Sequence, residues 1–530
     1  MTVMPELAQR NLGAVLGMGA AGYPDKVAVR DRVAALSYGD LWEDCLRVAG
    51  GFISLGVARQ DPVLVMLDNH LEFVRVWLGL AVGGAVEVPV NTAYLGSILS
   101  YVINQSCAKV MVVENCYLSR LVELAPELQG LETVVVRGDM PEGGLPWRVV
   151  SLNEVLAGRP TAPVTLDPWD LHGIMYTSGT TGPSKGVRVT HAHAYGYASP
   201  SAYGVATADD VAVVALPLFH IGGQWAGVYN ALIAGGSAVV LDGFHASEFW
   251  NDIRAFGCTV GLLLGAMADF LLRQPARLDD ADNPFRVAVV VPLGAEPHVF
   301  AQRFGVKVCT AYGSTEASAV IASGLDRIVP RSCGTLREGF EARLVDPNDM
   351  EVPVGQVGEL VVRAREPWML MDGYHQMPEA TVRAWRNLWF HTGDAFTRDE
   401  SGTFFFVDRT KDAIRRRGEN VSSFEVESEI SRHPAVAECA VVGVESAHSE
   451  QEIKASIVLQ PGTELSGEEL VRFLTGRLPY FMVPRYIEFR DELPRTPTQK
   501  IRKEALRAAG TEGNFDAVAA GVAPKRDPAR

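Results

Sequence analysis

Short apolar runs alternate with longer amphipathic segments over residues 30–405. Runs typical of buried strands occupy residues 63–66, 108–113, 211–214, 238–241 and 288–291. The segments at 72–82 and 249–256 have the length and apolar spacing of helices. Strands that alternate with helices in this way form parallel sheets covered by helices. The pattern therefore predicts an α/β fold for this part of the chain.

The pattern changes near residue 410, where a basic run precedes shorter elements. We predict two helices and three strands, in chain order at 424–432, 440–443, 453–458, 467–478 and 486–489. Together they make a compact α+β unit of ordinary domain size. The residues beyond 512 are mostly Ala, Gly, Pro and charged residues, a composition typical of a poorly ordered tail.

The predicted fold class is therefore α/β, with a large N-terminal domain of parallel sheets layered with helices and a small mobile α+β C-terminal domain. The predicted boundaries are residues 1–409 for the first, 410–511 for the second and 512–530 for the tail.

Composition narrows the class of protein. The chain has 530 residues and a net charge of −15 without a long basic block, which argues against nucleic acid as a partner. No apolar run reaches the roughly 18 residues of a membrane span, and the N-terminus lacks a signal-peptide pattern. The seven cysteines are scattered without a CxxC pair, as in proteins of a reducing compartment. We expect a cytoplasmic protein without stable membrane insertion, and a homodimer is the oligomer to test.

The segment YTSGTTGPSKG at residues 176–186 follows an apolar strand-like run. Its glycines permit positive φ and close backbone approach, while hydroxyls and successive N–H groups can surround an anion. It is not a Walker A loop, because Lys185 is flanked by Ser184 and Gly186. An anion-binding loop is therefore predicted at Thr177, Ser178, Gly179, Thr180, Thr181, Gly182 and Lys185.

This segment resembles, almost letter for letter, the [YF]TSGTTGxPKG signature of the adenylate-forming superfamily of acyl-CoA synthetases, luciferases and peptide-synthetase adenylation domains. One departure is the order Pro-Ser-Lys at 183–185, where the family more often has a residue, then Pro, then Lys. Ser423 stands where many members have proline, as in carnitine- and crotonobetaine-CoA-ligase-like members. The resemblance implies an AMP-forming acyl-CoA synthetase that uses a carboxylic acid, ATP, Mg²⁺ and CoA.

Further motifs follow in the family's order, and their roles are implied by the resemblance. In AYGSTEA at 311–317, Tyr312 would pack on adenine beside Gly313, Thr315 would bind phosphate, and Glu316 would hold Mg²⁺, which prefers carboxylate oxygen. The remaining nucleotide-binding positions are an adenine-contacting turn and a ribose-binding pair: Gly294, Ala295, Glu296, Asp394 and Arg409.

The C-terminal motifs resemble those that divide the reaction into two half-reactions. Lys500 would reach the substrate carboxylate and α-phosphate while the acyl-adenylate forms, although Gln499 replaces the family's usual glycine. The small domain would then rotate about Lys411 and present the loop that carries CoA-binding residues Gly418, Glu419 and Asn420.

His220 in LPLFHIGG resembles the residue that gates the acyl pocket, for which we also predict Gly223, Trp225 and Leu264. The apolar, glycine-rich residues here suggest a bulky or extended apolar acid. The carnitine-type resemblance would instead suggest a trimethylammonium acid, with Trp225 offering a cation–π face. We favour the apolar acid, because no carboxylate is evidently placed to pair with the ammonium group.

Three alternatives stay open. An amino-acid adenylation module loading a carrier protein is disfavoured by His220, since those relatives tend to have Asp there. A ligase that only thioesterifies a supplied acyl-adenylate is kept open by Gln499. A non-enzymatic binding protein is disfavoured because Thr315, Glu316 and Lys500 are all present.

Overall fold

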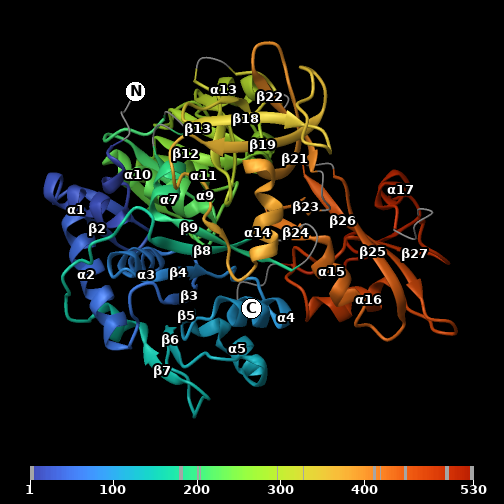
Figure 1. Cartoon of the computed structure of the whole chain (residues 1–530), viewed down its shortest axis with the longest axis horizontal. Helices are drawn as coiled ribbons and strands as arrows, with labels where there is room; N and C mark the ends of the chain where they lie inside the picture. Colours follow the sequence, from blue (N-terminus) through green and yellow to red (C-terminus); the bar gives the residue numbers. More distant parts are fainter. Residues whose placement is uncertain are drawn as a thin grey trace.

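The computed structural model describes residues 5–177, 183–199, 202, 205–294, 296–325, 328–409, 413–417, 419–446, 450–495 and 501–525. Three large sheets precede residue 410 and two smaller sheets follow it. Figure 1 shows the smaller C-terminal domain, in orange and red, at one side of the rest of the molecule.

The first large sheet has eight strands in the order β20-β9-β8-β4-β3-β5-β6-β7. Its strands are β3 (Pro62–Met66), β4 (Val86–Pro89), β5 (Val110–Glu114), β6 (Thr133–Arg137), β7 (Arg148–Ser151), β8 (Leu171–Thr177), β9 (Lys185–Thr190) and β20 (Gly373–Tyr374). The strands from β8 to β7 pair in parallel, whereas β9 and β20 join antiparallel at one edge.

The second sheet has the order β14-β13-β12-β10-β11-β1-β2 and is parallel apart from β2. Its strands are β1 (Val27–Arg30), β2 (Ala35–Ser37), β10 (Val211–Val214), β11 (Ser237–Val240), β12 (Val260–Leu264), β13 (Val287–Val291) and β14 (Lys307–Cys309). The predicted parallel sheets are thus confirmed in both.

Helices fill the layers on and between these two sheets. The middle layer holds α1 (Leu12–Gly22), α2 (Tyr38–Ser54), α3 (Leu71–Val82), α7 (His191–Ala198), α9 (Ile221–Gly223), the π-helix η4 (Gln224–Tyr229) and α10 (Asn230–Ala234). The outer layers hold α4 (Gly96–Ser106) and α5 (Leu118–Leu124) on the first sheet, and α11 (Phe249–Phe256), α12 (Gly265–Arg273) and α13 (Pro297–Phe304) on the second.

The third sheet is wholly antiparallel, a feature that the sequence did not predict. Its order is β15-β16-β17-β22-β21-β19-β18, formed by β15 (Ala311–Ser314), β16 (Ser318–Ala322), β17 (Gly334–Leu336), β18 (Phe340–Val345), β19 (Gly358–Ala364), β21 (Phe390–Arg398) and β22 (Thr403–Arg409). Strands such as β18 leave several side chains partly exposed, so they lack the continuous apolar runs used to find the parallel strands.

The C-terminal domain contains a hairpin, a four-stranded sheet and three helices. These are β23 (Ala413–Arg416), β24 (Glu419–Ser422), α15 (Ser423–Ile430), β25 (Val436–Glu445), β26 (Gln451–Leu459), α16 (Gly467–Thr475), β27 (Tyr486–Phe489), α17 (Lys503–Ala508) and β28 (Phe515–Asp516). Alternation along β26 places Ile453 and Ala455 in the cluster beneath α15 and α16, and Lys454 on the opposite face beneath α17.

The expectation of a poorly ordered tail does not hold for its described part. Strand β28 pairs with β27, and Ala517 is fully buried. The ring of Phe515 lies so close to Gly467 that a Cβ there would be 2.4 Å from it. Long-range packing of these few apolar residues therefore orders a segment whose composition suggested a loose tail.

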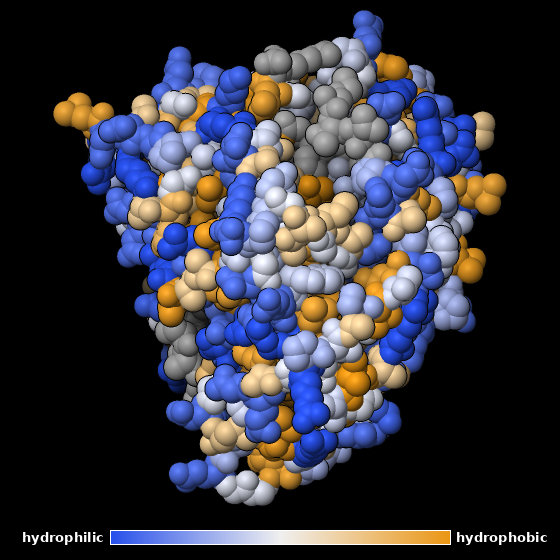
Figure 2. Space-filling view, turned by 90° about the vertical axis from the view of Figure 1, so that its left-hand side faces the viewer, coloured by the Kyte–Doolittle hydropathy of each residue, from blue (hydrophilic) through white to orange (hydrophobic). Residues whose placement is uncertain are grey.

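No helix within the described ranges is long and apolar enough to span a bilayer. Figure 2 shows polar and apolar residues intermingled over one face of the molecule.

Candidate functional site

The predicted anion-binding loop begins and ends on two paired strands. Thr177 at the end of β8 faces Lys185 at the start of β9 across the antiparallel pair. The Lys185 Nζ lies 4.8 Å from the ring centre of Tyr374, a cation–π distance. Ser178, Gly179, Thr180, Thr181 and Gly182 lie outside the described residues.

Glu316 lies beside the beginning of this loop. Its Oε1 accepts hydrogen bonds from Thr177 Oγ1 at 3.2 Å and from the Tyr374 hydroxyl at 3.3 Å. Burial, with the nearby Glu316 carboxylate, raises the pKa of Tyr374, so this phenol stays a neutral donor. Thr315 lies in the same turn between β15 and β16.

A magnesium ion fits the chemistry of this corner. Hydroxyl and carboxylate oxygens are the donors it prefers, and it is commonly held by one or two carboxylates together with substrate phosphates and water. Within the described ranges, no three His, Cys, Asp or Glu residues gather into a metal-binding group. A cation held by Glu316 would take its other ligands from phosphate and water, as Mg²⁺ commonly does.

Three of the predicted adenosine-binding residues lie on strands of the third sheet: Tyr312 on β15, Asp394 on β21 and Arg409 on β22. The Tyr312 hydroxyl donates to Asp394 Oδ2 at 2.5 Å, and Asp394 faces Arg409 across β21 and β22. Gly313 has a structural reason to be glycine, because a Cβ there would lie 2.6 Å from the Ser318 carbonyl oxygen. The side chain of Arg409 lies outside the described part.

The predicted adenine-contacting turn is only partly described. The Gly294 carbonyl accepts a hydrogen bond from the Arg331 N–H at 3.1 Å, and Glu296 directly precedes α13. Ala295 is outside the described ranges.

His220 meets the C-terminal domain directly. Its Nε2 lies 2.8 Å from Glu419 Oε2, although the two residues are 199 positions apart. Glu419 begins β24, so the β23–β24 hairpin reaches the residue predicted to gate the acyl pocket. Gly418, Lys411 and Lys500 are not among the described residues, and neither is the side chain of Asn420.

A cleft of about 610 Å³ lies between the two parts of the chain. Its lining includes Phe219 and Leu264 from the large domain, and Arg417 and Glu419 from the hairpin. Arg416 also borders it, but this side chain is 4% exposed and is held by Glu452 at 2.7 Å. Arg417 is exposed, so it is the better placed of the two to meet an anionic ligand in the cleft.

The predicted acyl-pocket residues are not gathered in one cavity. Leu264 lines the cleft, whereas Gly223 packs so tightly that a Cβ would lie 2.4 Å from the Pro217 carbonyl oxygen. Trp225 is fully buried, with its ring centre 5.6–6.0 Å from those of three neighbours, His172, His193 and Tyr197. The pocket roles of Gly223 and Trp225 stay predictions.

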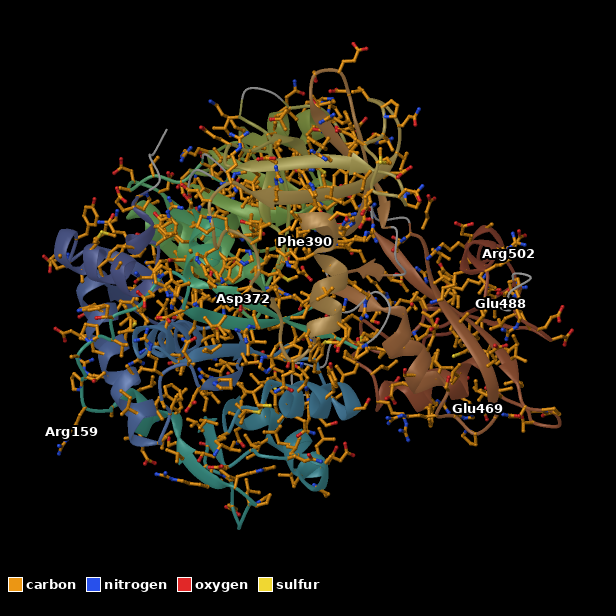
Figure 3. All side chains as sticks on the ribbon, viewed as in Figure 1. Arg159, Asp372, Phe390, Glu469, Glu488 and Arg502 are labelled. Atoms are coloured by element: carbon orange, nitrogen blue, oxygen red, sulfur yellow. The ribbon has the colours of Figure 1, made fainter. Side chains whose placement is uncertain are left out.

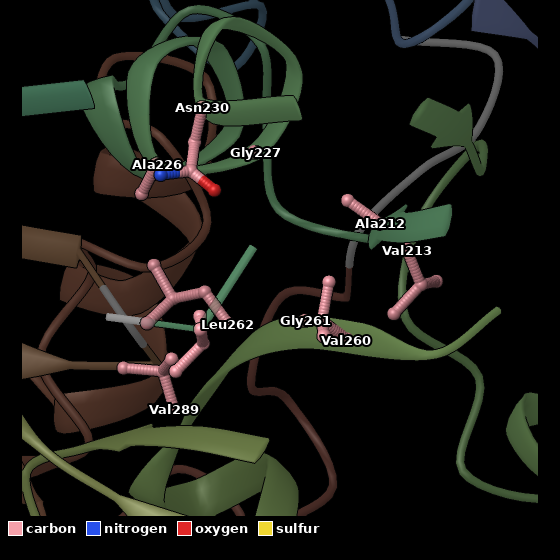
Figure 4. Close-up of a pocket in the computed structure, with 10 residues that line it drawn as sticks. Ala212, Val213, Ala226, Gly227, Asn230, Val260, Gly261, Leu262 and Val289 are labelled. Carbon is pink, nitrogen blue, oxygen red and sulfur yellow. The ribbon is translucent and has the colours of Figure 1, made fainter. Parts of the chain in front are cut away.

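A separate small cavity of about 20 Å³ lies between η4 and the second sheet (Figure 4). Apart from Asn230, every residue that lines it is apolar: Val205, Ala212, Val213, Ala226, Gly227, Val260, Gly261, Leu262 and Val289. It is a packing gap in its present form, because its volume is that of about one water molecule.

Sequence reasoning missed a buried acid behind His220. Glu87 on β4 is 1% exposed, and both of its carboxyl oxygens lie 2.9 Å from Gln224 Nε2. The Gln224 backbone N–H donates to the His220 carbonyl at 3.0 Å. Burial raises the pKa of Glu87 to about 8. The sequence feature that could have indicated this buried acid is the single carboxylate within the apolar run at 85–90.

Comparisons with known proteins match nearly the whole chain. The family model for the AMP-binding enzyme matches residues 18–375, and that for the AMP-binding enzyme C-terminal domain matches residues 425–500. A crotonobetaine/carnitine–CoA ligase of Salmonella paratyphi A is 35% identical over 502 residues, covering 92% of this chain and 96% of the relative.

Two solved structures illustrate the similarity of fold. Apo MatB from Rhodopseudomonas palustris is 30% identical with a TM-score of 0.67, covering 95% of this chain and 99% of that one. The o-succinylbenzoate CoA synthetase MenE from Bacillus subtilis, solved as a double mutant, has a TM-score of 0.82 over 94% of this chain and 99% of its own. Its identity is 23%, so it supports the fold alone.

Proposed function

Since the chain belongs to the AMP-binding enzyme family and is an AMP-forming acyl-CoA synthetase, we propose that it joins an apolar carboxylic acid to CoA in two half-reactions. The observation that supports this division of roles is a pair of contacts: Thr177 at the start of the glycine-rich loop meets Glu316, and Tyr312, four residues before Glu316, meets Asp394.

In the first half-reaction, a carboxylate oxygen of the acid attacks the α-phosphorus of ATP, and pyrophosphate leaves as the acyl-adenylate forms. Thr177 to Gly182, Lys185 and Thr315 bind the phosphates, while Tyr312, Asp394 and Arg409 hold the nucleoside. Glu316 would hold Mg²⁺, which when bound neutralises phosphate charge. Lys500 offsets the charge that develops at the reacting carboxylate and phosphate.

In the second half-reaction, the CoA sulfur attacks the acyl carbonyl, the thiol proton is released, and AMP leaves. The contact of Glu419 with His220 supports a role for the β23–β24 hairpin in this step, because it brings the predicted CoA-binding loop to the acyl site. Rotation of the C-terminal domain about Lys411 would exchange Lys500 for this hairpin.

The apolar acid is favoured over a trimethylammonium acid by the state of Glu87. A quaternary ammonium group needs an anionic or aromatic partner. With a pKa of about 8, Glu87 is mostly neutral at pH 7, and it is already hydrogen-bonded to Gln224. Trp225 is enclosed by other rings. The apolar side chains that the cleft does offer, Phe219, Phe244 and Leu264, support an apolar acyl group instead.

We further propose a cytoplasmic location, supported by seven cysteines that are all free thiols. The homodimer stays a prediction, to be tested by light scattering.

Pyrophosphate release over a panel of acids, with mass detection of the acyl-CoA, tests the proposal. We expect release in the presence of apolar acids, and a fall of about 10²–10³-fold in Lys500→Ala because a donor that stabilises developing charge is lost. Unchanged release would refute the role of Lys500. If no acid yields pyrophosphate but a synthetic acyl-adenylate gives thioester, the chain performs the second half-reaction alone.

A further inference from the structure

A pair of hydrogen bonds joins the anion-binding loop to the C-terminal domain. The backbone N–H and the hydroxyl of Ser184 both donate to Glu425 Oε1, at 2.9 and 2.5 Å. Ser184 is fully buried and Glu425 is 9% exposed. Burial raises the pKa of Glu425, whereas the two hydrogen bonds from Ser184 favour its carboxylate form. Hydrogen bonds shielded from water in this way are stronger than exposed ones.

Two other carboxylates of the same segment make similar contacts with the large domain. Glu419 meets His220, and Glu429 Oε1 accepts from the Ser97 hydroxyl at 2.5 Å. The neighbouring Ile98 of α4 packs into the apolar core of the C-terminal domain. Residues 419–429 thus dock on the large domain through three separate polar contacts.

The contact at Glu425 depends on the unusual order of residues in this loop. Where the resembling families more often have proline directly before the lysine, this chain has Ser184. Proline has no N–H and no hydroxyl, so it could make neither bond. The inverted order Pro-Ser-Lys is therefore what supplies both donors.

The acceptor is also fixed in place. Glu425 lies in the first turn of α15, where its N–H is capped by the Ser422 hydroxyl at 3.4 Å. Lys503 Nζ lies 2.8 Å from both Ser423 Oγ and Glu427 Oε1, which ties this turn to the start of α17. The carboxylate is thus presented to the loop by a restrained helix.

We propose that Ser184 and Glu425 form a latch, a contact that stabilises the domain orientation in which Glu419 reaches His220. The latch rests on the proposed function, because that orientation is the one assigned to thioester formation. Both residues are positioning residues that act through the hairpin. Loss of the latch should slow the second half-reaction and leave the first largely unchanged.

Separate assays of the two half-reactions test the latch. The first is followed by acid-dependent exchange of labelled pyrophosphate into ATP, and the second by conversion of a synthetic acyl-adenylate with CoA and no ATP. In Glu425→Gln the charged acceptor is lost, so we expect thioester formation to fall about tenfold. Exchange should stay within about twofold of the parent.

Variants of Ser184 remove one or both of the hydrogen bonds in the same contact. Ser184→Ala removes the hydroxyl but keeps the N–H, so thioester formation should fall about threefold. Ser184→Pro removes both donors and should match Glu425→Gln. In the double variant Ser184→Pro/Glu425→Gln the losses should not add, because both changes break one contact.

The matched control is Glu468→Gln. Glu468 lies on α16 in the same domain, is partly exposed, and pairs with Arg472 of the same helix. Both half-reactions should keep their parent rates in this variant.

The possible outcomes separate the latch from the function on which it rests. An equal fall in both half-reactions, with a lowered Tm, would mean that the contact is merely structural and would overturn the latch. So would unchanged thioester formation in both Glu425→Gln and Ser184→Pro. If the parent protein itself fails to convert the acyl-adenylate, the proposed second half-reaction is wrong and the latch falls with it.

Discussion

The two sides of the C-terminal domain hold their charged residues in different ways. The docked side, formed by Glu419, Glu425 and Glu429, pairs each carboxylate with a group of the large domain. The outer side, beneath α17, buries Lys454 within the domain itself. Contacts of the first kind can be exchanged for water when two domains separate, whereas those of the second persist in either orientation. The C-terminal domain thus has one face whose contacts depend on the domain orientation and one face whose contacts do not.

The outer side is built around a completely buried lysine. Lys454 Nζ donates to the carbonyls of Leu506 and Gly510 at 3.2 and 2.7 Å and pairs with Glu488 at 3.2 Å. Figure 3 shows Glu488 and Arg502 on this side of the domain. Arg495 and Ile501 bridge across the segment that contains Lys500. Lys454 therefore anchors the elements that flank the predicted adenylation lysine.

The largest expected effect comes from removing this support. Lys454→Met removes the ammonium group from the Leu506 and Gly510 carbonyls and leaves Glu488 with Arg490 as its remaining cation, so we expect about 3 kcal/mol of unfolding free energy to be lost. Urea unfolding measures this change. Pyrophosphate exchange should fall more than thioester formation, because α17 flanks Lys500. Lys109→Met, at an exposed ion pair on the large domain, is the control and should leave the urea midpoint unchanged. Equal losses of unfolding free energy in Lys454→Met and Lys109→Met would contradict the stabilising role of Lys454.

An intermediate effect is expected from acidification. Burial alone would raise the pKa of Glu488, but hydrogen bonds from Arg490, Ser456 and Lys454 lower it to about 2. A depressed carboxyl pKa contributes stability above its unfolded value of about 4.3, and this is lost as the pH falls toward 2.

After allowance for solvent screening, this contribution is about 1–2 kcal/mol. It should be absent from the pH dependence of unfolding in Glu488→Gln, measured from pH 6 to pH 2.5. A parallel pH profile in the parent and the variant would contradict the assignment.

The smallest effect is expected at the edge of the docked side. Among the described residues of the large domain, Ser97 is the one donor to Glu429, so Glu429→Gln should slow thioester formation only about threefold. Ser97→Ala should have the same effect, and the pair should couple in a double-mutant cycle. A loss equal to that of Glu425→Gln would mean that docking is shared evenly along α15.

The sequence predicted the elements whose pattern is local. Helix α11 and strand β27 have the bounds expected from their apolar spacing, and β3, β10 and β13 lie within a residue of the predicted runs. The antiparallel third sheet was missed because half-exposed strands such as β18 lack such runs. The tail was misjudged because Phe515 and Ala517 are ordered by contacts with distant elements.

The candidate site was likewise predicted only in part. The resemblance assigned Tyr312 and Asp394 to one ligand, and the structure brings these residues, 82 positions apart, into contact. The resemblance gave no indication that Ser184 and Glu425 are in contact. They are 241 positions apart and meet through the docking of two domains. Trp225 was predicted to line the acyl pocket, where it could offer a cation–π face, but burial among three rings is not visible in a local pattern.

The direct succession of Ser184 and Lys185 has a consequence for the timing of catalysis. The residue that would accept phosphate charge and the residue that receives the Glu425 carboxylate are neighbours on one strand end. Two anions brought this close repel each other. Docking would then be disfavoured while the triphosphate is in place and permitted once pyrophosphate has departed. In this way one loop would delay thioester formation until the acyl-adenylate has been made.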